Sequence, residues 1–181
     1  LTVLKDKNLK HPPIEDLFTI DEEAGMTGAK NLGAGLLSGK RLLNIDTEDD
    51  EEITIGCAGG IDTNVELEFR MEDTPENTKA YFISVKGLAG GHSGMDIDLG
   101  RGNANKILFR LLFQGYSRFG MRIASVDGGG LRNAIPREAF ATVVVDIQKT
   151  GEFETHLLQL GNAIKTELRT MEPNLEILWE S

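Results

Sequence analysis

The chain has 181 residues, with 29 acidic side chains against 19 basic ones and a formal net charge of −10. An acidic surface is repelled by nucleic acids and anionic membranes, so neither is an expected partner. A hydrophobic content of 40% can form a core, and the length fits one domain, or a small domain with part of another.

The only cysteine is Cys57, which excludes an internal disulfide framework. The simplest inference from a chain without internal disulfides is a reducing compartment, so we expect a cytoplasmic protein. No stretch approaches the roughly 20 apolar residues of a membrane span. The chain starts at Leu1, without a start methionine or a signal-peptide pattern, so we interpret it as an excised piece of a longer protein.

Residues 1–60 have the pattern of an α/β domain. The short apolar runs at residues 17–20, 42–45 and 53–58 predict buried strands, and residues 24–32 predict a short helix. Strand, helix and strand in this order indicate a βαβ piece of a larger sheet. We therefore expect only part of an α/β domain here.

Residues 61–181 have a different pattern. Residues 65–72 alternate apolar and charged side chains, which predicts a half-exposed strand of an antiparallel sheet. Further along, we expect strands at residues 81–85, 121–126, 138–147 and 175–179, and amphipathic helices at residues 104–116 and 153–168. From residue 79 the order is β-α-β-β-α-β, the ferredoxin-like pattern in which two helices cover one face of a sheet.

An acidic pair, Glu22 and Glu23, follows the first apolar run, and Asp46 follows the second. Adjacent residues face different ways, so one carboxylate can bind a cation while its neighbour holds a water, as a two-zinc hydrolase requires. The alternatives are that the pair stabilises a helix N-terminus and that Asp46 caps a turn. Spacing alone leaves both readings open.

His92 lies in a glycine-rich loop, Gly90-Gly91-His92-Ser93-Gly94. Glycines permit unusual backbone angles and close approach of a ligand, so His92 is a candidate catalytic or substrate-binding residue. A second glycine loop ends in Asn133, whose side chain suits a carboxylate or carbonyl group. The alternative for His92 is a histidine in a surface loop, and the alternative for the second glycine loop is a tight turn. His156, on a predicted helix, is expected to face solvent.

Read together, six segments resemble the metallopeptidase M20 family, and within it the aminoacyl-histidine dipeptidase branch, also called cytosolic non-specific dipeptidases. They are TIDEEAGM (19–26), NIDTE (44–48), GCAGG (56–60), KGLAGGHSG (86–94), GRGNANK (100–106) and GLRNAIPREA (130–139). They span almost the whole chain in the family's order.

The resemblance implies a zinc dipeptidase, with a catalytic α/β domain and an inserted lid domain, that cleaves dipeptides such as carnosine and forms homodimers. Residues 1–60 would be part of the catalytic domain, and residues 61–181 an incomplete lid or dimerisation domain. Glu22 would then be the general base, and Glu23 and Asp46 would each bind one of two zinc ions, or other divalent metals. His92 would stabilise the reaction intermediate, and His92 and Asn133 would contact substrate.

The resemblance also implies ligands that this sequence lacks: an early His-x-Asp pair, a bridging aspartate and a late histidine. We therefore expect the longer protein to be active and this piece to be inactive. Two other hypotheses are another M20 hydrolase, such as an aminoacylase or carboxypeptidase, and a non-catalytic lid that mediates only association.

Overall fold

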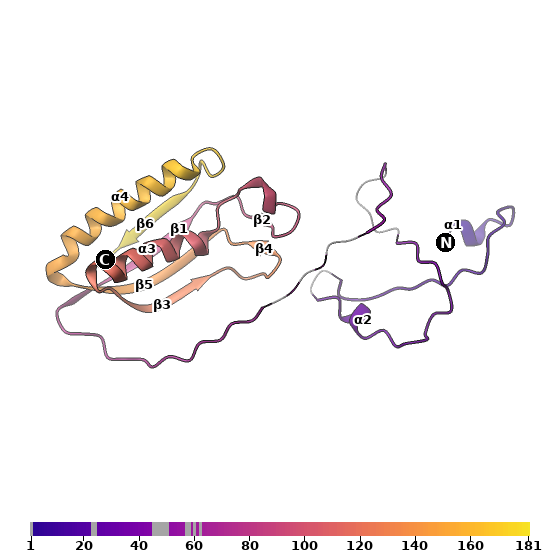
Figure 1. Cartoon of the computed structure of the whole chain (residues 1–181), viewed down its shortest axis with the longest axis horizontal. Helices are drawn as coiled ribbons and strands as arrows, with labels where there is room; N and C mark the ends of the chain where they lie inside the picture. Colours follow the sequence, from indigo (N-terminus) through magenta and orange to yellow (C-terminus); the bar gives the residue numbers. More distant parts are fainter. Residues whose placement is uncertain (1, 23–24, 45–50, 57–58, 60, 62) are drawn as a thin grey trace. The chain divides into compact units, whose positions relative to one another are not determined.

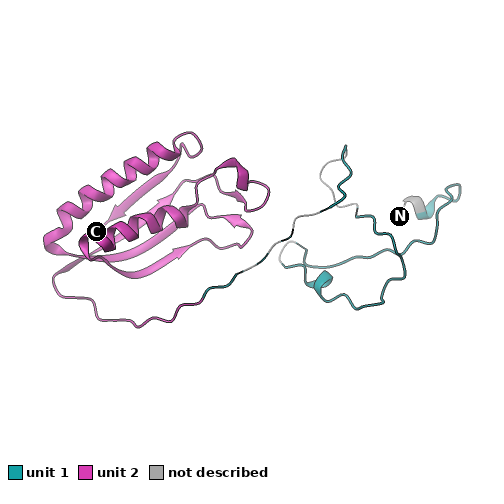
Figure 2. Ribbon diagram, viewed as in Figure 1, with its two compact units in different colours: residues 1–65 teal, residues 66–181 magenta. Residues whose placement is uncertain are grey.

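The computed structural model describes residues 2–22, 25–44, 51–56, 59, 61 and 63–181. The chain forms two units, Leu1–Val65 and Glu66–Ser181, coloured separately in Figure 2. The expected domain boundary was at residue 60. In the part of the chain that the structure describes, no helix is both long and apolar enough to cross a membrane.

The first unit has little regular structure. Its described residues contain two one-turn helices, α1 (Thr2–Lys5) and α2 (Thr27–Lys30), and no strand. The strands predicted at residues 17–20, 42–44 and 53–56 are therefore wrong, while residues 45, 57 and 58 lie outside the described ranges. The predicted helix at residues 24–32 shortens to α2.

The apolar runs of the first unit fail as strands because no described part of the unit buries them. Phe18 is 87% exposed, Leu43 88% and Ile55 99%. A strand gains stability from backbone pairing and from packing one face against other apolar groups, and these side chains have neither. The α/β interpretation of residues 1–60 therefore has no strand to support it among the described residues.

The second unit is built on an antiparallel sheet with strand order β3-β5-β1-β6. Its elements are β1 (Thr78–Lys86), α3 (Ala104–Phe119), β3 (Arg122–Gly128), β5 (Ala139–Asp146), α4 (Thr150–Leu168) and β6 (Glu176–Glu180). Both helices lie on one side of the sheet (Figure 1). The predicted β-α-β-β-α-β order is confirmed, and the strand order is that of a split βαβ fold.

The core fills the space between the helices and one face of the sheet. Alternate residues of β5 are buried, and β1 places Tyr81, Ile83 and Val85 on the same face. Tyr81 contacts Phe153 of α4 edge to face, with ring centroids 5.2 Å apart. The period of two in the strands and the helical spacing in α3 and α4 are therefore both satisfied by one apolar layer.

Local signals set the ends of α3. The side chain of Asn103 accepts a hydrogen bond from the backbone N–H of Lys106, which caps the helix N-terminus. Gly120 ends the helix with φ of 68°, a left-handed conformation that glycine adopts without steric cost. The helix is therefore longer than the predicted 104–116.

The strand predicted at residues 65–72 is wrong. Residues 65–72 form neither a strand nor a helix, and their apolar side chains are exposed. Alternating apolar and charged side chains give the segment two faces, but a strand also needs a second strand to pair with. Glu72 of this segment forms an ion pair with Arg122. Tyr116 and Ile147, the last residues of the helix predicted at 104–116 and the strand predicted at 138–147, both have exposed side chains.

Four short elements were not predicted. β2 (Gly91–His92) and β4 (Ala134–Ile135) form a separate two-stranded ladder, and η1 (Ile97–Leu99) is one turn of 3-10 helix after β2. A further 3-10 turn, η2 (Ile147–Lys149), joins β5 to α4. β2 and β4 bring together the two glycine loops that carry His92 and Asn133.

The first prediction compares two neighbouring leucines of α4. Leu157 is 1% exposed and Leu158 is 53% exposed. Leu157→Ala leaves a cavity in the core, so we expect the free energy of unfolding to fall by about 2–5 kcal/mol. Leu158→Ala has the same effect on helix propensity but removes little burial, so we expect a loss of about 1 kcal/mol or less.

Urea unfolding of the chain, followed by circular dichroism, measures both losses. Equal losses in the two variants would show that the apolar layer described here is not the core of the second unit.

Candidate functional site

The ladder between β2 and β4 places two of the predicted site residues side by side in the backbone. Gly91 pairs with Ile135 and His92 with Ala134. Next to them, the backbone N–H of Ser93 donates to the carbonyl oxygen of Asn133 at 2.8 Å. The structure therefore joins the His92 loop and the Asn133 loop.

The imidazole of His92 is held by its own loop. Its Nδ1 atom accepts hydrogen bonds from the backbone N–H groups of Gly94, at 3.0 Å, and Met95, at 3.2 Å. A nitrogen that accepts carries no hydrogen, so the hydrogen of the neutral ring lies on Nε2. Because the side chain is exposed, Nε2–H is available to donate to a group outside the loop.

Two charged residues that the sequence interpretation missed hold the backbone around His92. One carboxylate oxygen of Asp96 accepts the His92 backbone N–H at 2.8 Å and forms an ion pair with Arg101 at 3.1 Å. Arg101 also donates to the carbonyl oxygen of Gly90 at 2.6 Å. These contacts close the loop on itself.

The glycines of the loop serve this packing. Gly91 has φ of 142°, and a β-carbon there would collide with the guanidinium of Arg101 and the carboxylate of Asp96. The sequence interpretation assigned the glycines to close approach of a ligand. In the structure, the space beside Gly91 is filled by the charged pair.

Glu22 lies in a tight turn of the first unit. The carbonyl oxygen of Asp21 accepts from the backbone N–H of Gly25 at 3.2 Å and of Met26 at 2.5 Å, and the Asp21 carboxylate accepts from the Thr27 hydroxyl. Asp21 has φ of 62°. The Glu22 side chain is exposed, whereas Glu23 and Asp46 lie outside the described residues.

The described residues do not by themselves form a metal site. Within them, no three His, Cys, Asp or Glu side chains come together closely enough to hold an ion. The carboxylate of Asp21, beside Glu22, is already bonded to Thr27. A zinc site requires about three protein ligands, so the described part of this chain does not fit one.

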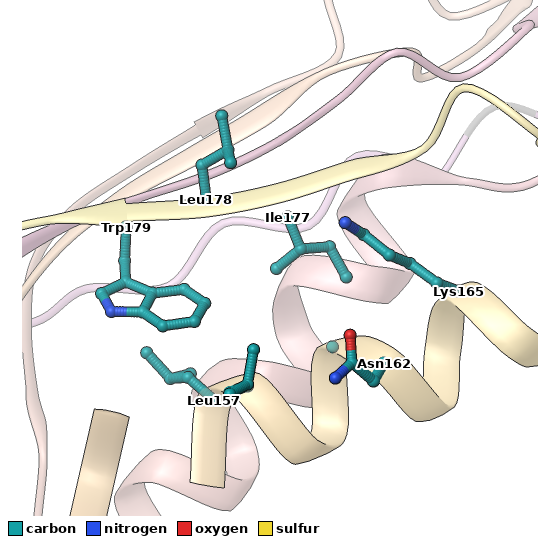
Figure 3. Close-up of a pocket in the computed structure, with 8 residues that line it drawn as sticks. Leu157, Asn162, Lys165, Ile177, Leu178 and Trp179 are labelled. Carbon is teal, nitrogen blue, oxygen red and sulfur yellow. The ribbon is translucent and has the colours of Figure 1, made fainter. Parts of the chain in front are cut away.

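A surface groove between α4 and β6 lies within the second unit (Figure 3). Leu157, Ile177 and Trp179 line it, with the polar ends of Asn162 and Lys165 at its edge. Among the described residues, no predicted site residue, carboxylate or histidine lines this groove. Its described lining therefore offers no carboxylate or imidazole for hydrolysis.

His156 does not face solvent as predicted. Its ring packs against Phe119, with centroids 5.6 Å apart, and its Nδ1 atom lies 3.5 Å from a guanidinium nitrogen of Arg118. Nε2 is buried without a hydrogen-bond partner in the described part of the chain. Burial lowers the pKa of His156 below its ordinary value of 6.5, and the positive charge of Arg118 lowers it further.

The second prediction follows from this lowered pKa. The folded state favours neutral His156, so its contribution to stability is complete above the unfolded pKa of 6.5 and is lost as the pH falls below it. We expect His156→Gln to lose less stability than the wild type between about pH 7.5 and about pH 5. Urea unfolding at the two pH values tests this, and a steeper loss in the variant would contradict it.

Comparison with known proteins identifies the second unit first. Residues 83–172 match the family model of the peptidase dimerisation domain, M20_dimer. This range runs from the middle of β1 to the residues after α4 and includes both His92 and Asn133. The class of domain is therefore a peptidase dimerisation domain on a split βαβ sheet.

The whole chain is also similar to known dipeptidases. It is 43% identical over all 181 residues to the cytosol non-specific dipeptidase of Escherichia coli (strain K12) and covers 37% of that protein. It also matches the crystal structure of aminoacylhistidine dipeptidase from Vibrio alginolyticus, with a TM-score of 0.75 and 39% identity. That match covers 97% of this chain and 36% of the other.

The chain belongs to the M20 peptidase family, as its motifs indicated, and its relatives lie in the aminoacyl-histidine dipeptidase branch. It spans little more than a third of the length of these two relatives.

Proposed function

We propose that the whole protein carrying this chain is a zinc-dependent dipeptidase that hydrolyses dipeptides, including aminoacyl-histidine substrates such as carnosine. The observation that carries this proposal is the 43% identity to a non-specific dipeptidase along the entire chain. That alignment includes both the acidic pair and the His92 loop.

The geometry of His92 is compatible with its proposed role. Peptide hydrolysis develops negative charge on the carbonyl oxygen of the scissile bond, and a fixed hydrogen-bond donor stabilises that charge. His92 has its Nδ1 held by two backbone N–H groups, which leaves Nε2–H as the donor. Asn133, held beside it, would contact the substrate through its side-chain amide.

We assign the proton transfer to Glu22 and metal binding to Glu23 and Asp46. Glu22 would accept a proton from the attacking water, and its carboxylate is exposed. Glu23 and Asp46 would each bind one zinc ion, since carboxylates are ligands that zinc accepts. Zinc supplies Lewis-acid chemistry when bound, and its other ligands would come from outside the described residues.

The match to a dimerisation domain supports a homodimer as the working form of the protein. The net charge of −10 supports a protein that binds neither nucleic acid nor an anionic membrane. The single cysteine and the similarity to a cytosol dipeptidase support a location in the cytoplasm.

The third prediction is the substrate test. The whole protein with zinc should release free amino acids from carnosine and other dipeptides, and chelation should abolish the release. This chain alone should be inactive, because its described residues bring together no metal-binding group. Release from N-acyl amino acids but not from dipeptides would favour an aminoacylase instead.

The same panel separates the remaining alternatives. Cleavage of longer peptides from their carboxyl ends would favour a carboxypeptidase. A whole protein that dimerises but hydrolyses none of these substrates would favour a domain that only mediates association.

The fourth prediction separates the roles of the acidic pair. Glu22→Gln in the whole protein should abolish turnover and leave the zinc content close to that of the wild type, because the base is lost and the ligands stay. Glu23→Gln should also lower the zinc content, since it weakens a ligand. Metal analysis beside kinetic assays measures both, and a larger zinc loss in Glu22→Gln would reverse the assignment.

A further inference from the structure

A carboxylate outside the predicted site is buried beside the His92 loop. Glu172, which follows α4, is 3% exposed. Its Oε2 atom accepts the backbone N–H of Ala89 at 2.7 Å, and its Oε1 atom accepts the backbone N–H of Gly102 at 2.7 Å. A carboxyl group buried this deeply is costly unless it is hydrogen-bonded, and two backbone donors meet this requirement.

These two hydrogen bonds connect segments that are distant from Glu172 in the sequence. Ala89 leads into the glycines before His92, and Gly102 leads into Asn103, the cap of α3. A β-carbon at Gly102 would collide with Leu88 and lie 3.0 Å from Cγ of Glu172. The two segments are therefore packed around one carboxylate.

Arg101 connects this carboxylate to His92 itself. It precedes Gly102, donates to the carbonyl oxygen of Gly90 at 2.6 Å and pairs with Asp96 at 3.1 Å. Asp96 in turn accepts the His92 backbone N–H at 2.8 Å. Hydrogen bonds, joined by the peptide link from Gly102 to Arg101, thus connect the buried Glu172 to the backbone of His92.

We propose that Glu172 and the Asp96–Arg101 pair are positioning residues for His92, which fix the loop so that its Nε2–H points at the reacting oxygen. This inference rests on the proposed function of His92. A donor misplaced by about 1 Å can cost about 100-fold in rate, so a fixed loop has a direct kinetic consequence. Glu172 itself acts through the loop, because its two oxygens are bonded to the backbone.

The central test is Glu172→Gln. The amide keeps one acceptor oxygen but presents an NH₂ group to the second backbone N–H, so one of the two loop connections is lost. The matched control is Glu167→Gln, the same chemical change on α4 in an exposed pair with Arg110. Both carboxylate oxygens of Glu167 bond to Arg110 and not to the His92 loop.

In the whole protein, we expect kcat to fall at least about tenfold in Glu172→Gln, with KM within about threefold of the wild type. Glu167→Gln should match the wild type in both. Wild-type kcat in Glu172→Gln, or an equal loss in both variants, would overturn the proposal.

A second measurement does not depend on activity. Nitrogen-15 NMR of the His92 ring in this chain reports which of its two nitrogens carries the hydrogen. We expect one Nε2–H tautomer in the wild type and in Glu167→Gln, and a mixture of tautomers in Glu172→Gln. If the whole protein proves not to be a dipeptidase, this readout still decides whether Glu172 fixes the ring, and an unchanged tautomer would overturn that role.

Asp96→Asn gives an independent test if Glu172→Gln does not fold. Asp98→Asn, on an exposed side chain two positions away, is its control. We expect the same fall in kcat and the same mixture of tautomers for Asp96→Asn alone. A mixed tautomer with wild-type kcat would show that the fixed ring is not needed for catalysis, and would also overturn the proposal.

Discussion

The pairing of β1 on both edges determines most of the second unit. β1 bonds to β5 along one edge, from Thr78 to Val85, and to β6 along the other, from Phe82 to Lys86. Its inner face carries Tyr81, Ile83 and Val85 against the helices. Directly after β1, Gly87 has φ of 80°, and a β-carbon there would collide with the backbone carbonyl of Asn174. The pairing of β1 and the contact at Gly87 therefore fix the position at which the His92 loop begins.

Several acidic side chains of this protein accept hydrogen bonds from backbone N–H groups. Glu15 accepts from the backbone of Ser38 and Gly39, and these hydrogen bonds lower its pKa. Asp146 accepts from the backbone of Gln148 where β5 ends. Together with Asp96 and Glu172, these residues show that part of the acidic excess closes loops. A high count of carboxylates therefore does not by itself indicate a metal site.

The sequence was sufficient for the order of the main strands and helices of residues 78–180, because their signals are local and their core is complete. The periodicities of the strands and of α3 and α4 are satisfied within residues 78–180, so the predicted order of elements is confirmed. The first unit has the same kind of apolar runs, but Phe18 and Ile55 remain exposed. A pattern that depends on a partner surface cannot be interpreted from the segment alone.

The same distinction applies to the candidate site. Glycines beside His92 made the loop recognisable, and the match to a dimerisation domain includes it. Glu172 was missed because its partners, Ala89 and Gly102, lie 83 and 70 positions away and bond through backbone atoms. No spacing or residue type in the sequence marks such a contact. His156 was missed because a helical position does not reveal that Phe119 covers it.

The two backbone N–H groups on Nδ1 of His92 also determine what its ring cannot do. In a neutral imidazole, only the nitrogen without hydrogen has a lone pair with which to coordinate a metal or attack an electrophile. Here that lone pair faces Gly94 and Met95 within the loop. As long as the loop is closed, His92 is therefore neither a ligand nor a nucleophile. Exposure of a histidine and its availability as a base are separate properties in this protein.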